Sequence, residues 1–169
     1  RRERIQDMEL RMRFSLRFGM PDSGDSASEM GRSVEEMIPC LLSKEVVGNR
    51  RAGLWASFIT SPSSPSEVRG VFDGINYLCK RFPEDPNGVR ISFGIFMFIP
   101  GLHFSEAFDR YEGDCDSVEE IDQDRVLDML SELQAARIKE LEKKVAELEK
   151  FADPLRVLSS EVQRKEEAE

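Results

Sequence analysis

Histidine and cysteine are scarce in this sequence, and their scarcity limits the chemistry that it supports. The chain has a single histidine, His103, and three cysteines that lie far apart in no paired motif, Cys40, Cys79 and Cys115. Such spacing indicates neither a zinc site nor a disulfide framework. Two of the three cysteines have apolar neighbours, so we expect buried, reduced thiols, as in a cytoplasmic protein.

Long apolar runs and a secretion signal are absent as well. No stretch approaches the roughly 20 apolar residues of a membrane-spanning helix, and no signal-peptide pattern opens the chain. We therefore expect a cytoplasmic protein with no membrane partner. Because the chain begins with Arg1 rather than methionine, we also expect it to be part of a longer protein.

The sequence contains no recognised catalytic or phosphate-binding motif. Its glycines form neither GxxxxGK[ST] nor GxGxxG. His103 lies near Ser105 and Glu106, but the members of a catalytic triad come from separate segments, and no nucleophile elbow holds this serine. We predict no catalytic residue, no cofactor and no enzymatic activity. The alternative is a small enzyme or regulatory domain with its site near His103.

A run of acidic residues follows this histidine and raises the question of a metal site. Carboxylates at such spacing are suitable ligands for Ca²⁺. However, the glycine and the terminal glutamate of an EF-hand loop are not at the required offsets. We predict a solvated acidic loop without a metal, and calcium binding stays an open alternative. The carboxylates concerned are Asp114, Asp116, Asp122 and Asp124.

The charge balance argues against a nucleic-acid partner. The net charge is -9, whereas nucleic-acid binding depends on clustered lysine and arginine. The arginine-rich region is the beginning of the chain, where Arg11, Arg13 and Arg17 alternate with the apolar residues of segment 10–18. This period of two predicts a strand that buries one face and leaves the arginines in solvent. A weak nucleic-acid binder through these three arginines is a further alternative.

Two other segments predict strands and an α+β fold. Residues 53–60 and 89–100 are rich in aromatic and β-branched side chains. We expect the second segment to be a central strand covered on both faces, and we expect Trp55 to anchor the core. The prediction is a globular α+β domain over residues 1–111, in which a small sheet of at least three strands packs with two helices.

Capping signals locate the two helices of this domain. Ser33 and Ser64 each precede a capping-box glutamate, which predicts helices over residues 33–43 and 65–80. Between the first strand and the first helix, glycine, proline and small polar residues predict a mobile loop over residues 20–32. The residues of the second helix expected to be buried are Val68, Val71, Phe72, Ile75, Leu78 and Phe82.

Residues 112–124 are strongly acidic and indicate a linker and the start of a long helix. Ser117 and Glu120 form a third capping box, which predicts that this helix spans residues 117–152. An Asp-Pro pair after it predicts a second or kinked helical segment over residues 153–169.

The later turns of this helix carry a coiled-coil pattern. With Ile138 at heptad position a, β-branched residues fall at a and leucine at d, which favours two parallel strands. The g positions are basic and the e positions acidic, so a parallel second copy would bring opposite charges together, although antiparallel pairing stays open. The predicted homodimer interface is Ile138, Leu141, Val145, Leu148 and Leu155. The predicted charge-pairing residues are Arg137, Glu142, Lys144 and Glu149.

An earlier apolar set on the same helix is out of phase with this register. Because a phase break ends or changes a supercoil, we expect the first turns to pack on the globular domain and only the later turns to form the seam. The out-of-phase residues are Val126, Leu127, Leu130 and Leu133.

Residues 93–100 read FGIFMFIP, with apolar or aromatic residues at the first, third, fourth and sixth places and proline at the eighth. This pattern resembles the FxFYxFxP strand of C2-like domains in nephrocystin-type ciliary proteins. It departs from that pattern after the proline, where Gly101 to His103 replace the usual threonines. The resemblance implies a C2-like β-sandwich as the alternative fold. It also implies an association with coiled-coil scaffolds of the cytoskeleton or cilium.

The sequence as a whole predicts a non-enzymatic scaffold or adaptor. Charge-matched heptads indicate a homodimer, and the lack of a catalytic constellation leaves a protein partner as the expected ligand of the paired domains. The identity of that partner cannot be read from the residues.

Overall fold

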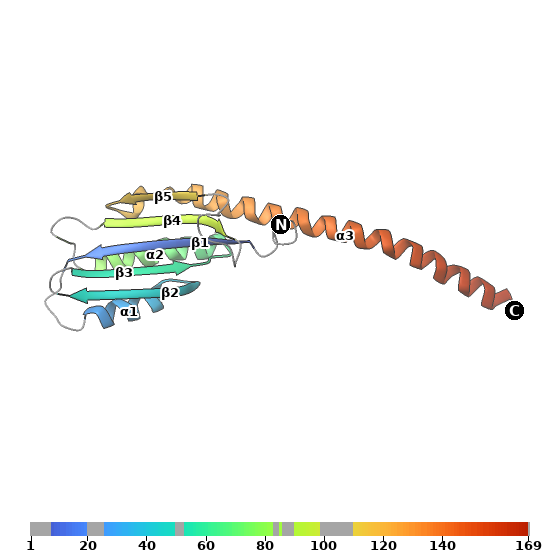
Figure 1. The fold of residues 1–169 in the computed structure, drawn as a ribbon, viewed down its shortest axis with the longest axis horizontal. Coiled ribbons are helices and arrows are strands. Elements are labelled where there is room, and N and C mark those ends of the chain that lie inside the picture. Colours follow the sequence, from blue (N-terminus) through green and yellow to red (C-terminus); the bar gives the residue numbers. More distant parts are fainter. Residues whose placement is uncertain are drawn as a thin grey trace. The chain divides into compact units, whose positions relative to one another are not determined.

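The structure, a computed structural model, describes residues 8–19, 26–49, 53–82, 85, 90–98 and 110–168. Contacts divide the chain into a body, Asp7–Leu133, and a second unit that contains Gln134–Glu169. In chain order the elements are β1 (Glu9–Phe18), α1 (Ser26–Met37), β2 (Leu41–Asn49), β3 (Gly53–Thr60), α2 (Pro65–Arg81), β4 (Arg90–Phe98), β5 (Arg110–Cys115), the 3-10 helix η3 (Val118–Glu120) and α3 (Gln123–Ala168) (Figure 1).

Strand β1 lies at the centre of the sheet. Within the described residues, five strands form one sheet in the order β2-β3-β1-β4-β5, and neighbouring strands are antiparallel. Phe14 on β1 lies opposite Phe58 on β3 and Phe93 on β4. The first six elements follow the order β-α-β-β-α-β with β1 between β3 and β4, which is the split β-α-β arrangement. The predicted α+β fold class is confirmed.

One face of the sheet carries the hydrophobic core. Alternate residues of β1, including Met12, Phe14 and Leu16, are fully buried. The ring of Phe14 lies 5.5 Å from that of Phe58 and 6.2 Å from that of Phe72 on α2, measured between centroids. Helices α1 and α2 and the first turns of α3 add buried residues to the same cluster. The intervening residues of β1, which include its arginines, therefore belong to the opposite face.

Three of the predicted elements are confirmed almost to the residue. Strands β1 and β3 cover the segments that the period of two and the β-branched content indicated. Helix α2 begins with Pro65 after Ser64, whose Oγ accepts a hydrogen bond from the N–H of Glu67 at 3.2 Å. The six residues expected to be buried are buried: Val68, Val71, Phe72, Ile75, Leu78 and Phe82.

The first helix differs from its prediction at both ends. Helix α1 spans Ser26–Met37, so residues 26–32 are helical although a loop was predicted there. Met30 and Val34, one turn apart, are fully buried and hold this segment on the sheet. Ser33 lies inside the helix, not at its N-cap, which is why the capping pattern misplaced the start.

Pro39 explains why this helix ends before residue 43. Proline has no N–H for a helical hydrogen bond, and it disfavours helical backbone in the residue before it. The chain instead turns through Cys40, whose φ of 57° is in the left-handed region, and strand β2 begins at Leu41. No sequence signal had indicated β2.

Strands β4 and β5 correct two further expectations. Burial along β4 alternates from Arg90 to Phe93 and becomes continuous only from Ile95 to Phe98, so just its second half is covered on both faces. Strand β5 spans the predicted boundary between the domain and the acidic linker, with residues 112–115 in the linker segment, and it pairs with β4. The body thus extends past residue 111, and the strands among its described residues form one sheet, unlike the two-sheet sandwich of the C2-like alternative.

The long helix begins later than predicted. Ser117 and Glu120 do form a capping box, but it caps η3. Helix α3 starts at Gln123, where the carboxylate of Asp122 accepts a hydrogen bond from the N–H of Arg125 at 3.2 Å. The buried residues of its first turns, which belong to the body as expected, are Val126, Met129, Leu130 and Leu133.

Helix α3 then continues as one element to Ala168. Pro154 lies inside it, where the sequence had indicated a second or kinked segment. In the part of the chain that the structure describes, no helix is both long and apolar enough to cross a bilayer.

Candidate functional site

An exposed apolar stripe runs along the second part of α3. Ile138, Leu141, Val145 and Leu148, four of the five predicted interface residues, are 53–69% exposed, and the fifth, Leu155, is 66% exposed. They repeat at three- and four-residue spacing, so they share one face of the helix. A row of large apolar side chains left in solvent is the usual mark of a surface that another molecule covers.

Charged residues flank this stripe. Glu142 and Glu149 at e and Lys144 at g are exposed, and within the described residues none of the three forms an ion pair. Arg137, at the preceding g position, is half-buried. In a parallel pair each g residue faces the e residue five positions later on the other helix. Arg137 would then face Glu142, and Lys144 would face Glu149.

The stripe is longer than the strict heptad pattern indicates. Phe151 follows Leu148 after three residues, where the heptad requires four. This step keeps large side chains on one face of the helix, but it shifts the heptad positions of all later residues. Such a three-residue insertion locally overwinds a coiled coil. Sequence reasoning missed Phe151 because it lies one position before the expected a site. The large side chains that extend the stripe are Phe151, Leu155, Leu158 and Val162, all at least 55% exposed.

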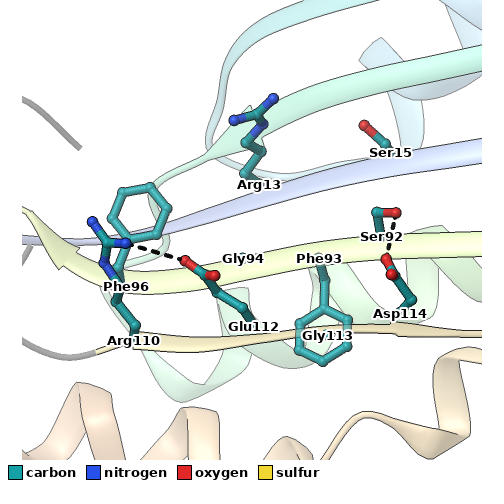
Figure 2. Close-up of a pocket in the computed structure, with 10 residues that line it drawn as sticks. All are labelled: Arg13, Ser15, Ser92, Phe93, Gly94, Phe96, Arg110, Glu112, Gly113 and Asp114. Atoms are coloured by element: carbon teal, nitrogen blue, oxygen red, sulfur yellow. Dashed lines mark hydrogen bonds and ion pairs between the residues drawn. The ribbon is translucent and has the colours of Figure 1, made fainter. Parts of the chain in front are cut away.

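The sheet face opposite the helices is polar and hollowed. Arg13, Gly94 and Glu112 lie side by side on β1, β4 and β5. Because glycine has no side chain, a hollow of about 590 Å³ opens between the arginine and the carboxylate (Figure 2). Nη1 of Arg110 lies 3.6 Å from Oε1 of Glu112, so that carboxylate is paired. The guanidinium of Arg13 forms no ion pair within the described residues.

Serines form the floor next to this hollow. Ser15 on β1 lies between Ser57 on β3 and Ser92 on β4. The hydroxyl of Ser15 donates to Oγ of Ser57 at 3.3 Å, and the hydroxyl of Ser92 donates to Oδ1 of Asp114 at 2.6 Å. Figure 2 shows the Ser92 and Asp114 side chains meeting across β4 and β5. The side chains at the centre of this face are therefore short and hydrophilic.

Two arginines lie directly opposite each other on this face. Arg17 on β1 faces Arg90 on β4 on one side and Trp55 on β3 on the other. Neither arginine forms an ion pair with any described residue. Arg17, Arg90 and Trp55 line a second hollow, of about 520 Å³. The carboxylates that border it are Asp114, Asp116 and Glu120.

Sequence reasoning identified only one member of this row. It named Arg17, but it missed Arg90 and assigned Trp55 to the core. The inward positions of β3 belong to Leu54 and Ala56, so Trp55 is half-buried on the opposite face. In the sequence, Leu54, Ala56 and Phe58 recur with a period of two, and this pattern could have placed Trp55 on the other face.

The three cysteines are half-buried, whereas buried thiols were expected for two of them. Burial, assisted by a hydrogen bond that the thiol donates to Glu67, raises the pKa of Cys40 to about 11. Burial and the nearby Glu120 raise the pKa of Cys115 to about 11. Because the thiolate is the reactive form, both thiols are poor nucleophiles near neutral pH.

The other predicted site residues do not form a described constellation. His103, Ser105 and Glu106 lie outside the described residues. Of the acidic residues, Asp114 accepts a hydrogen bond from Ser92 and Asp122 caps α3. No group of three histidine, cysteine, aspartate or glutamate side chains gathers as metal ligands within the ranges that the structure describes.

No family model matches the chain, and no curated protein matches it significantly. Its function is therefore inferred from its own residues, which offer two distinct surfaces: the stripe on α3 and the polar face of the sheet.

Proposed function

We propose that this protein is a non-enzymatic scaffold or adaptor of the cytoplasm that forms a homodimer through α3. The later turns of α3 pair with those of a second copy as a parallel coiled coil, and the two α+β bodies present a doubled surface to a protein partner. The observation that carries the proposal is the exposed apolar stripe from Ile138 to Val162.

The stripe holds two chains together only if it is used along its whole length. Full burial of one large aliphatic side chain contributes about 1.5–3 kcal/mol. The four residues from Ile138 to Leu148 are 53–69% exposed, so two chains together gain roughly 7–14 kcal/mol from them. Association itself costs about 4–15 kcal/mol, which leaves the first half marginal. Phe151, Leu155, Leu158 and Val162 roughly double the gain.

The flanking charges favour the parallel orientation. In a parallel pair the basic g residues Arg137 and Lys144 face the acidic e residues Glu142 and Glu149. In an antiparallel pair g faces g and e faces e, so like charges would meet. Each exposed pair contributes only about 0.2–1 kcal/mol, which is enough to select the orientation without being the source of the affinity.

Dimerisation supplies the means by which such a protein would act. Two linked bodies bind a multivalent partner with an avidity that exceeds the affinity of either body, without any new contact. The resemblance of residues 93–100 to the strand of nephrocystin-type proteins leads us to include a cytoskeletal or ciliary protein as the proposed partner.

A charge placed inside the seam tests this function. We expect Leu141→Glu combined with Leu148→Glu to give a monomer in light scattering at concentrations where the unchanged chain is a dimer, since four carboxylates would be buried between the helices. The matched control, Ala146→Glu with Ser160→Glu, adds the same charge at exposed positions outside the seam and should leave the dimer intact. Equal effects of the two double variants would contradict the proposed seam.

A further inference from the structure

The polar face of the sheet carries a second site, which does not depend on dimerisation. Trp55, Arg17 and Arg90 form one row across β3, β1 and β4, and Arg13 lies four residues before Arg17 on the same face of β1. We propose that this row, together with Arg13, binds single-stranded nucleic acid. Arg13, Arg17 and Arg90 would bind its phosphates, and a base would stack on Trp55.

The negative net charge does not oppose such a site, because it is unevenly distributed. Residues 112–132 are rich in acidic residues, and their carboxylates Glu112, Asp114, Asp116 and Glu120 line the β5 side of this face. Strand β1 itself carries three arginines and a single carboxylate. That carboxylate, Glu9, is paired with Arg11, whose Nε lies 3.2 Å from Oε2. A phosphate-binding site depends on the local cluster of cations, while the net charge sets the long-range approach.

The arginines are arranged as if an anion were to lie between them. Arg13, Arg17 and Arg90 are exposed and form no ion pair with any residue in the described part of the chain. Arg17 and Arg90 occupy directly opposed positions on neighbouring strands, where like charges destabilise a sheet. A phosphate placed between the two guanidinium groups removes the repulsion and accepts hydrogen bonds from both.

The floor of the site suits a sugar-phosphate backbone better than a protein. Ser15, Ser57 and Ser92 leave the surface low, so that a strand can lie close to the sheet, and their hydroxyls are of the kind that contact phosphate and sugar. The centre of a stable protein interface is instead apolar and aromatic.

Trp55 and the acidic edge define where the strand lies. The indole is half-buried beside Arg17, which makes it a platform on which any base can stack. Asp114 and Asp116 border the second hollow on the β5 side and repel phosphate. The bound strand is therefore confined to the part of the face formed by β3, β1 and β4.

The binding of a labelled oligouridine of about 12 nucleotides to the full chain, followed by fluorescence anisotropy, tests the proposal. Three phosphate contacts predict a slope of about -2 for log K against log salt, a loss of roughly twentyfold between about 50 and about 200 mM. Arg17→Gln with Arg90→Gln should reduce that slope to about -0.7. Trp55→Ala should weaken binding by about fivefold or more. Absence of binding at about 50 mM salt would overturn the proposal.

The matched control removes the same charge from the helical side of the body. Arg32→Gln with Arg69→Gln, on α1 and α2, should leave both affinity and slope unchanged. An equal loss in this control would show that net charge, not the row on the sheet, governs binding, and the proposal would fail.

Cross-linking of the unchanged protein gives an answer even if a variant does not fold. An oligouridine that contains photoreactive 4-thiouridine should cross-link to peptides of β1 and β3. Cross-links confined to the helices would overturn the site.

Discussion

Pro154 offers the sharpest test of how far the association extends along α3. The residue lies inside the helix, where it cannot donate a hydrogen bond to the carbonyl of Lys150 and crowds that carbonyl, at a cost of about 3 kcal/mol. After the three-residue step at Phe151, Leu155 and Leu158 fall at the core positions, so Pro154 lies at the flanking g position beside the apolar stripe, and it is exposed. Pro154→Ala therefore changes the stability of the helix and leaves the apolar stripe unaltered.

The size of the effect depends on whether pairing reaches this turn. If the turns around Pro154 become helical only when two chains pair, both chains gain, and the total of about 6 kcal/mol corresponds to a Kd roughly 10⁴-fold lower. Sedimentation equilibrium of the variant measures this Kd. Glu161→Ala, one heptad later at the equivalent position, is the matched control and should change the Kd little. An unchanged Kd for Pro154→Ala would show that the helicity of these turns is not coupled to pairing.

Two further predictions concern orientation and the packing of the body. Ile138→Cys should form a disulfide-linked dimer on mild oxidation, because position a faces itself in a parallel pair. Lys139→Cys, at the outer b position, should not. On a non-reducing gel, a cross-linked dimer of Lys139→Cys but not of Ile138→Cys would contradict the parallel seam. Gly74→Ala should lower the free energy of unfolding in urea by about 1–3 kcal/mol, because a Cβ there would overlap the carbonyl oxygen of Met37. Gly70→Ala, where the nearest atom is 3.1 Å away, should cost less, and equal stability of the two variants would argue against the close crossing of α1 and α2.

The elements that the sequence predicted well are those whose signals are local. Strands β1 and β3 alternate strictly between buried and more exposed residues, and α2 has its N-cap serine, first-turn proline and apolar stripe within one segment. The break between the early turns of α3, buried in the body, and the exposed stripe was also predicted, because it appears as a phase change in the apolar pattern.

The strands that were missed lie at the two edges of the sheet. Strand β2 is mostly exposed, and β5 alternates between exposed and half-buried residues, so neither shows the apolar periodicity of a half-buried strand. Both exist through pairing with β3 and β4, and pairing between distant segments leaves no local signal. The same reason explains why the row on the polar face was missed, since only the register of three strands brings Trp55, Arg17 and Arg90 together.

The mass of the unchanged chain in solution tests the central claim most directly. Sedimentation equilibrium from about 1 to about 100 µM covers the affinities at which a scaffold of this kind associates. The account predicts a rise from the 19.3 kDa of one chain to twice that mass. A mass that stays at 19.3 kDa over the whole range would contradict the pairing of α3.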